Sequence, residues 1–363
     1  MGSLLEIGPR ALDLDGVADF IAWGFTTGTR TLLQDVERVV PTLELPEPRG
    51  ANDRADHLWE LLTDATRPAR PRTWCALSGG LDSRAIAAAS GATVATFGEA
   101  DAADLPVATR VAEALGRDHV VSVLPADAAL VHEDRVFAAS GGLGGADAAP
   151  GAATDALWGA DCDVLLSGMS GDVVWGDTAL GGRTPDSRLR KLGVRRAVGD
   201  PRTAVPDPPA WTSPSGREAW LNLWTRQAHV TWNGVLSRLP FTEVVPVAWT
   251  PAVLSFCLTL DADERRDRAL LQSMLARHAP ELSGIAPVRG TTYDLDRAMT
   301  SPTWRTELEA MARDRQAWRA LGLAPRGVAR LLRLQADGKR RRAALVSRLR
   351  VLRRWAQLQG GWS

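Results

Sequence analysis

The stretch Thr73–Ser90, TWCALSGGLDSRAIAAAS, joins a short apolar segment to an alanine-rich segment through Ser78 and two adjacent glycines. The first segment has the composition of a buried strand, and the second has that of a helix. Glycines at such a junction let backbone N–H groups approach phosphate oxygens, and a helix N-terminus attracts negative charge. Asp82 adds a carboxylate of the kind that holds magnesium against phosphates. The stretch therefore predicts a phosphate-binding loop, and the alternative interpretation is a Gly-Gly turn with a polar cap.

Strand-like and helix-like patterns alternate on both sides of this loop. The expected strands are 72–77, 92–97, 119–124 and 162–167, and the expected helices are 53–66, 82–90, 104–116, 127–139 and 153–159. Such alternation predicts an α/β fold, in which a parallel sheet carries helices on both faces. Residues 216–280 and the C-terminal region have helical patterns, so we expect a mainly helical part after the sheet.

The composition is that of a globular protein without a membrane span. Apolar residues make up 45% of the 363 residues and charged residues 24%, and no apolar run approaches the length of a spanning helix. The N-terminus has no secretory signal, which predicts a cytoplasmic protein. The three cysteines and five histidines show no metal-ligand spacing, which argues against a metal hydrolase or a redox dithiol.

Three units are expected along the chain. Residues 1–50 form a small unit that ends in a proline-marked linker, residues 51–300 form the main domain, and residues 301–363 form a basic helical tail. Residues 179–211 are rich in Gly, Pro, Arg and Asp and show no period, which predicts a mobile surface loop.

A second Gly/Ser/Asp loop, LLSGMSGDVVWGD, spans Leu165–Asp177 and ends another expected strand. Because the carboxyl ends of parallel strands meet at one edge of a sheet, Asp172 in this loop is expected to face Asp82. Two carboxylates that converge on a polyphosphate form a magnesium clamp. The alternative is an aspartate in a solvated turn, since turns favour this residue.

The first loop lacks the lysine that follows the glycines in kinase-like phosphate loops, and it resembles the SGGxDS pyrophosphate loop of ATP pyrophosphatases. With both loops considered, the chain resembles the synthetase half of class B asparagine synthetases, a family that includes β-lactam synthetase and the lasso-peptide macrolactam synthetases. The resemblance spans about residues 15–295 and also includes DGVADFIAWGFTTGTRTLLQDVERVVP, which looks like the family's interdomain segment, and FTEVVPVAWTPAVLSFCLTL, which looks like its ExRxPFLD segment.

This resemblance implies an adenine nucleotide alpha-hydrolase-like fold and an AMP-forming, ATP-dependent carbon–nitrogen ligase. In such a reaction a carboxylate attacks the α-phosphate of ATP, releases pyrophosphate and forms an acyl-adenylate, and an amine then displaces AMP. The resemblance further implies that Asp82 and Asp172 hold Mg²⁺ and that Glu243 is the active-site glutamate. The residues that it implies for ATP are Leu77, Ser78, Gly79, Gly80, Asp82, Ser83, Phe97 and Gly168.

The chain also departs from the family pattern. It begins Met1-Gly2-Ser3 and has no N-terminal cysteine, so we do not expect it to release ammonia from glutamine. Met169 stands in the second loop where asparagine synthetases have glutamate, and Val245 replaces the arginine of ExRxPFLD. The family's late catalytic lysine is missing, and its nearest counterpart is Arg289, which could donate to a phosphate or an oxyanion but is a poor proton acceptor.

Three functions remain open at this point. The first is an ATP-dependent amide or lactam synthetase that acts on a peptide, as in lasso-type macrolactam closure, or on another natural product. The second is an asparagine synthetase that uses free ammonia or a separate glutaminase partner. The third is a non-catalytic member that binds nucleotide or a partner. The expected partners are a carboxylate substrate and a leader-peptide-binding or processing protein, and no nucleic acid is expected.

The C-terminal region is strongly basic, with Asp337 as the one acid between Arg326 and Arg354. Within AALVSRLRVLRRWAQL, one helical face carries Leu345, Leu349, Leu352 and Ala356, with arginines around it. One interpretation is an amphipathic helix that packs its leucines on the domain and leaves its arginines solvated. The other is a docking surface for an acidic leader peptide, a partner protein or an anionic surface.

Overall fold

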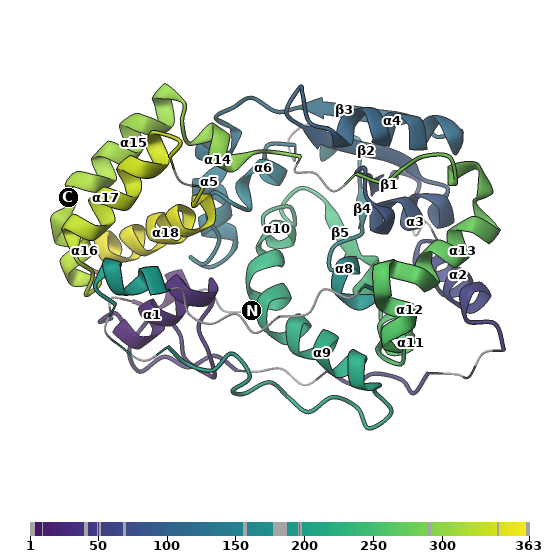
Figure 1. Ribbon diagram of the computed structural model, residues 1–363, viewed down its shortest axis with the longest axis horizontal. Coiled ribbons are helices and arrows are strands. Elements are labelled where there is room, and N and C mark those ends of the chain that lie inside the picture. Colours follow the sequence, from purple (N-terminus) through teal and green to yellow (C-terminus); the bar gives the residue numbers. More distant parts are fainter. Residues whose placement is uncertain are drawn as a thin grey trace.

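A five-stranded parallel sheet forms one half of the protein, and helices pack on both of its faces (Figure 1). The computed structural model describes residues 4–8, 10–39, 43–48, 50, 52–67, 70–154, 158–176, 187–194, 196, 198–288, 292–339 and 341–360. The strand order is β3-β2-β1-β4-β5. The strands are β1 (Thr73–Ala76), β2 (Thr93–Gly98), β3 (His119–Val123), β4 (Val164–Ser167) and β5 (Glu243–Pro246). The predicted α/β class, with a mainly helical part after the sheet, is confirmed.

Alternate side chains of the inner strands β1 and β2 enter different cores, as the pleat of a strand requires. Cys75 and Val94, which are register partners on β1 and β2, face the larger core. Trp74 and Ala95 point to the other face, where they pack with the buried ring of Trp158. Both faces of the sheet are therefore covered, which accounts for the nearly continuous apolar character of the strands.

The larger core lies between the sheet and a group of helices at the right of Figure 1. These helices are α2 (Arg54–Ala65), α3 (Leu81–Ser90), α4 (Asp104–Ala114), α8 (Gly171–Val174), α9 (Pro214–Asn222), α11 (Pro251–Leu258), α12 (Ala262–Arg265) and α13 (Ala269–His278). Local signals set several of their ends. Asp53, for example, accepts the N–H groups of Ala55 and Asp56 and so caps α2.

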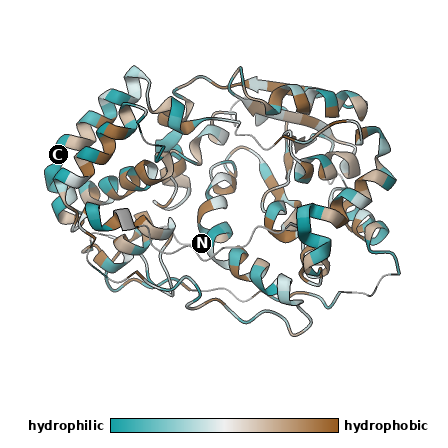
Figure 2. Ribbon diagram, viewed as in Figure 1, coloured by the Kyte–Doolittle hydropathy of each residue, from teal (hydrophilic) through white to brown (hydrophobic). Residues whose placement is uncertain are grey.

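A second core lies at the other end of the molecule and is formed mainly by helices. Its helices are α1 (Leu14–Trp23), α5 (Ala128–Ala139), α6 (Ala149–Ala152), α14 (Leu295–Ala298), α15 (Pro302–Arg313), α16 (Arg315–Ala320), α17 (Pro325–Ala336) and α18 (Ala343–Gly360). In Figure 2 these helices alternate hydrophilic and hydrophobic segments along their length, as amphipathic helices around one core do. Within the described residues, no helix is long and apolar enough to cross a membrane.

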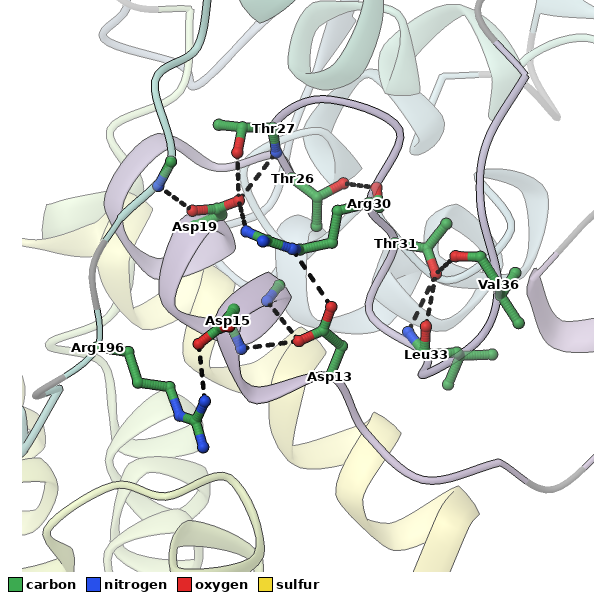
Figure 3. A network of polar contacts seen from close by, with 12 residues as sticks. Asp13, Asp15, Asp19, Thr26, Thr27, Arg30, Thr31, Leu33, Val36 and Arg196 are labelled. Carbon is green, nitrogen blue, oxygen red and sulfur yellow. Dashed lines mark hydrogen bonds and ion pairs between the residues drawn. The ribbon is translucent and has the colours of Figure 1, made fainter. Parts of the chain in front are cut away.

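The N-terminal segment belongs to this second core. Helix α1 packs beside α18, and the buried carboxylate of Asp19 ties the segment to distant parts of the chain (Figure 3). Asp19 accepts the Thr27 N–H at 3.0 Å, the Gly199 N–H at 2.7 Å and Arg30 Nη1 at 3.1 Å. Such a carboxylate, satisfied on both oxygens, holds the N-terminal residues against the region around Gly199.

Two features interrupt the expected helical region 216–280. The π-helix η3 (Leu223–Thr231) separates α9 from α10 (Asn233–Leu236), and π-helical turns are often found at functional sites. Strand β5 was not predicted. It has four residues, ends in Pro246 and, within the described residues, pairs with β4 alone, so it is a short edge strand that carries little strand signal.

The helix expected at 153–159 stays a prediction, because residues 155–157 lie outside the described part. Helix α6 ends at Ala152, and Trp158 is helical, with its N–H donating to the Thr154 carbonyl at 2.9 Å. Another local prediction needs correction. Of the expected mobile loop 179–211, Ser187–Leu192 instead form the 3₁₀-helix η2, with Leu189 and Leu192 buried in the second core. Two leucines three residues apart on a helical turn are enough to dock this segment.

Candidate functional site

The two glycine-rich loops meet at the point where the strand order reverses. The chain moves from β1 outward to β2 and β3, then returns to the other side of β1 for β4 and β5. In open parallel sheets, ligands bind at this switch point, beyond the carboxyl ends of the strands. The SGGLDS loop follows β1 and the SGMSGD loop follows β4, so the fold brings the two sequence motifs side by side.

Glycines are required where the two loops touch. A Cβ added at Gly168 would lie 3.1 Å from the Ser83 nitrogen, and one added at Gly171 would lie 2.9 Å from the Asp82 Cβ. Contacts this short leave no room for a side chain. The second loop therefore lies directly against the first turn of α3, and the sequence prediction that the motifs converge is supported for Gly168.

The backbone N–H groups at the start of the first loop are held by the protein itself. The Ser78 N–H donates to Ser83 Oγ at 3.0 Å, and the Gly80 N–H donates to Ser78 Oγ at 3.2 Å. The Gly79 N–H donates to Asp104 Oδ1 at 2.6 Å, and Asp104 is only 4% exposed. Helix α3 begins after Gly80 without a side-chain cap, so its N-terminus is the part of the loop that offers an electropositive end to an anion.

Asp82 is part of a charged pair. Arg268 donates from Nε to Oδ1 at 2.7 Å and from Nη2 to Oδ2 at 3.2 Å, and Trp175 Nε1 donates to Oδ1 at 2.8 Å. Arg268 has a φ of 62° and follows Asp267, whose φ is 50°. Each left-handed non-glycine residue costs on the order of 1 kcal/mol. Strained backbone thus presents a guanidinium to the carboxylate of the first loop.

Ser170 shapes the second loop. Its φ is 66°, also in the left-handed region. Its hydroxyl donates to Gln227 Oε1 at 3.0 Å and accepts from Trp249 Nε1 at 3.1 Å. Gln227 comes from the π-helix and is 1% exposed, and Trp249 packs edge-on against Trp232 at 5.4 Å between ring centroids. The π-helix therefore supports the conformation of the loop that carries Asp172.

The donor set fits magnesium in kind. Asp172 lies in the first turn of α8, directly after the Gly171 that packs on Asp82. Within the described residues, no group of three or more His, Cys, Asp or Glu side chains could hold a metal by itself. Mg²⁺ is usually held by one or two carboxylates together with substrate phosphates, so two aspartates on adjoining loops suit it.

The two residues expected beside adenosine lie on opposite faces of the sheet. Leu77 is 4% exposed, and its side chain enters the larger core. The ring of Phe97 packs against the ring of Trp158, with 5.9 Å between the two centroids. The guanidinium of Arg238 lies 5.4 Å from the centroid of the Phe97 ring. Their roles in nucleotide binding stay predictions.

Glu243 lies at the other end of the sheet. It opens β5 opposite Val164, which opens β4, whereas both loops follow the carboxyl ends of the strands. Its carboxylate is 53% exposed and pairs with Arg70 at 3.2 Å. Counted from Pro246, the glutamate position of ExRxPFLD is Thr242, four residues before the proline, and the arginine position is Val244 rather than Val245. The structure therefore does not bring the Glu243 carboxylate to the two loops.

Arg289 lies outside the described residues, but the segment before it reaches the first loop. The Val288 N–H donates to the Gly79 carbonyl at 3.0 Å. Arg84, which is 2% exposed, donates to the Gly79 carbonyl at 3.4 Å and to the Ile285 carbonyl at 2.6 Å, and burial lowers its pKa. The turn-rich segment that the sequence marked is thus held against the loop by backbone and guanidinium contacts.

Three residues at the site carried no strong sequence signal. Arg268 is one of three arginines in ERRDR, and it is the left-handed backbone at this point that directs its side chain to Asp82. Trp175 resembles any core tryptophan. Asp104 opens the helix after β2, and its place near the carboxyl edge of the sheet was the one available signal.

A parallel sheet with two glycine-rich loops at its switch point defines a nucleotide-binding α/β protein. One family model, asparagine synthase, matches residues 57–319. The chain therefore belongs to the asparagine synthase family, and this membership supports an ATP-dependent ligase activity in general. The match begins within α2 and ends within α16, so it takes in part of the helical core. No curated protein matches the chain.

Proposed function

We propose that the protein is an amide-forming synthetase that activates a carboxylate as an acyl-adenylate, with release of pyrophosphate. The observation that carries this proposal is the convergence of the SGGLDS and SGMSGD loops at the switch point, in front of the uncapped N-terminus of α3. A helix N-terminus attracts the phosphates of ATP. Electrostatic stabilisation of the charge that builds on phosphorus would supply most of the catalysis.

Release of Asp82 from Arg268 would prepare the site for Mg²⁺. Arg268 neutralises the Asp82 carboxylate in the structure. When ATP binds, the phosphates compete for the guanidinium, because Arg pairs bidentately with phosphate as well as with carboxylate. Asp82 would then be free to join Asp172 in holding Mg²⁺. The ion, when bound, would neutralise phosphate charge.

Two tryptophans near the second loop support a preference for one substrate class. Trp249 donates to Ser170 and packs against Trp232, and this aromatic pair would offer an apolar wall for an organic acid larger than aspartate. Met169, where asparagine synthetases have glutamate, favours the same conclusion. We therefore prefer a peptide or another natural product that supplies its own amine, as in lasso-type macrolactam closure, to an ammonia-dependent asparagine synthetase.

Product analysis tests the proposal. The protein is incubated with ATP, magnesium and candidate acids, and the nucleotide products are separated by chromatography. AMP and pyrophosphate are expected, and formation of ADP and phosphate would overturn the proposal. Aspartate with ammonium is one arm of the experiment, because turnover there would instead identify the asparagine synthetase function.

Variants at the loop make the test independent of the acid substrate. Asp82→Asn should lose magnesium-dependent ATP binding, measured by calorimetry, while the exposed Asp207→Asn should bind as the wild type does. Arg268→Gln should change the magnesium dependence of binding, because Asp82 then has no guanidinium to release. Unchanged ATP binding in Asp82→Asn would rule out this loop as the nucleotide site.

A second candidate function is favoured by one observation. The N–H groups of Ser78, Gly79 and Gly80 already have internal acceptors, which is also what a non-catalytic, nucleotide- or partner-binding member would show. ATP binding without turnover of any acid, together with Asp82→Asn binding as tightly as the wild type, would favour this function over the synthetase.

A further inference from the structure

Helices α15 and α17 border a groove of about 1050 Å³ at the end of the molecule that is distant from the sheet (Figure 1). Six arginines and two acids line it. Three of the arginines, Arg326, Arg330 and Arg333, follow one another at helical spacing along a single face of α17. All three side chains are exposed.

The groove has an apolar floor between its charged walls. Leu308 of α15 and Leu332 of α17 are buried at its base, and Ala312 and Ala329 are partly buried beside them. Arginine stems add aliphatic surface above this floor. The groove can therefore accept apolar groups at its centre and negative groups at its edges.

The two acids of the groove already have cations. Glu309 pairs with Arg313 at 2.9 Å, and Asp337 pairs with Lys339 at 3.2 Å. By contrast, Arg315, Arg326, Arg330 and Arg333 make no ion pair with any other residue in the described part of the chain. Positive charge on this surface is thus left uncompensated by the protein's own acids.

We propose that this groove binds an acidic peptide segment of a partner protein. Carboxylates spaced along such a segment would meet the arginines of α17, and its aliphatic side chains would meet the leucine floor. No aromatic side chain lines the groove in the described residues, so the stacking platform that single-stranded nucleic acid uses is missing. A concave surface also suits a chain better than a flat membrane. The proposal does not depend on the reaction at the ATP loops.

Fluorescence anisotropy with a defined probe tests the groove in the full-length protein. The probe is a fluorescein-labelled peptide of repeated Glu-Glu-Leu-Ala, and the same peptide with Gln in place of Glu is its control. The variant is the triple substitution Arg326→Gln, Arg330→Gln, Arg333→Gln. The matched protein is the control variant, which loses the same number of positive charges at exposed arginines elsewhere on the surface through Arg110→Gln, Arg202→Gln, Arg217→Gln.

The Glu peptide should bind the wild type, should lose about tenfold or more in affinity with the groove variant, and should keep its affinity for the matched protein. The Gln peptide should bind weakly to all three. Equal affinity for the groove variant and the matched protein would overturn the proposal. So would tighter binding of an oligonucleotide, or of phosphatidylserine vesicles, through the same arginines. Circular dichroism spectra confirm that each variant is folded.

Discussion

Helices α17 and α18 are both rich in arginine, yet their charges lie in opposite environments. On α18 the four arginines after Ser347 all have internal acceptors. Arg348 donates to the backbone carbonyls of Ile21 and Ala22, and Arg353 pairs with Asp314 at 2.7 Å. Arg350 and Arg354 pair with acids on α5. On α17 the arginines of the groove face solvent.

Arg350 shows what makes the difference. It is 6% exposed, pairs with Glu133 and Glu307 at 2.6 Å each, and lies over the ring of Trp304. Burial alone would lower its pKa, but the two carboxylates more than offset this and raise the pKa. The same basic region thus contains two kinds of arginine: those of α18, which have internal acceptors, and those of α17, which are exposed to solvent. What distinguishes them is whether acceptors from distant parts of the chain lie beside them.

The largest expected effect in this comparison comes from removing α18. Deletion of Ala343–Ser363 should unfold the second core, because α18 contributes buried apolar side chains to it, namely those of Val346, Leu349, Leu352 and Trp355. The indole N–H of Trp355 also donates to the Gly142 carbonyl at 2.7 Å. Thermal denaturation followed by circular dichroism should show loss of a cooperative transition.

A truncated protein that folds with wild-type stability would contradict this role for α18. It would restore the alternative interpretation of the tail as a separable docking surface, in which deletion removes partner binding and leaves ATP binding intact.

Arg350→Met should have the next largest effect. It leaves the 1% exposed Glu133 carboxylate without its closest cation, and breaking a buried pair on one side costs about 3–5 kcal/mol. Urea unfolding measures the change, with Arg333→Met on α17 as the control, where we expect less than about 0.5 kcal/mol. Equal losses in both variants would remove the distinction between the helices.

The sequence predicted much of the nucleotide half, because its signals are local. The strands β1 to β4 alternate with helices, and both loops are marked by glycines. In the second loop, the close approach of Gly168 and Gly171 to α3 requires them. Strand β5 and the π-helix were missed, since a four-residue edge strand and a widened helical turn leave no period in the sequence. Of the two interpretations of the tail, the structure supports packing of its leucines, but its arginines are paired rather than solvated.

Charge partners could not be predicted in the same way. Asp82 pairs with Arg268 across 186 residues, and Arg350 reaches Glu133 across 217. Nothing in the local sequence distinguishes these arginines from their neighbours. Glu243 shows the reverse error: a glutamate near a matching motif was assigned to the site, but the strand register puts it at the opposite end of the sheet.

A partly buried histidine beside an arginine gives a third, smaller effect on stability. His229 stacks on Phe25 and contacts Arg38, and burial together with this arginine lowers its pKa from 6.5 to about 3. The unfolded chain therefore binds a proton that the folded protein does not. Stability from this residue is full above about pH 6.5 and is lost as the pH falls toward 3, by at most about 1.4 kcal/mol per pH unit and less where the ring edge meets solvent.

Urea unfolding at pH 7 and pH 5 checks this expectation. The wild type should lose more stability than His229→Gln, which can keep a hydrogen bond to Arg38 but does not titrate. Identical pH dependence of the two proteins would show that His229 is protonated as easily in the folded state as in the unfolded chain.

The smallest expected effect is that of neutralising α17. Arg326→Gln, Arg330→Gln, Arg333→Gln should leave the free energy of unfolding within about 0.5 kcal/mol per site, since none of the three side chains has an ion pair in the described part of the protein. A slight gain is expected at low salt, because like charges at i and i+4 repel by a few tenths of a kcal/mol, and added salt should raise the stability of the wild type more than that of the variant. A loss above about 1 kcal/mol per site would mean that these arginines are bound internally, as those of α18 are, and are not free to meet an acidic partner.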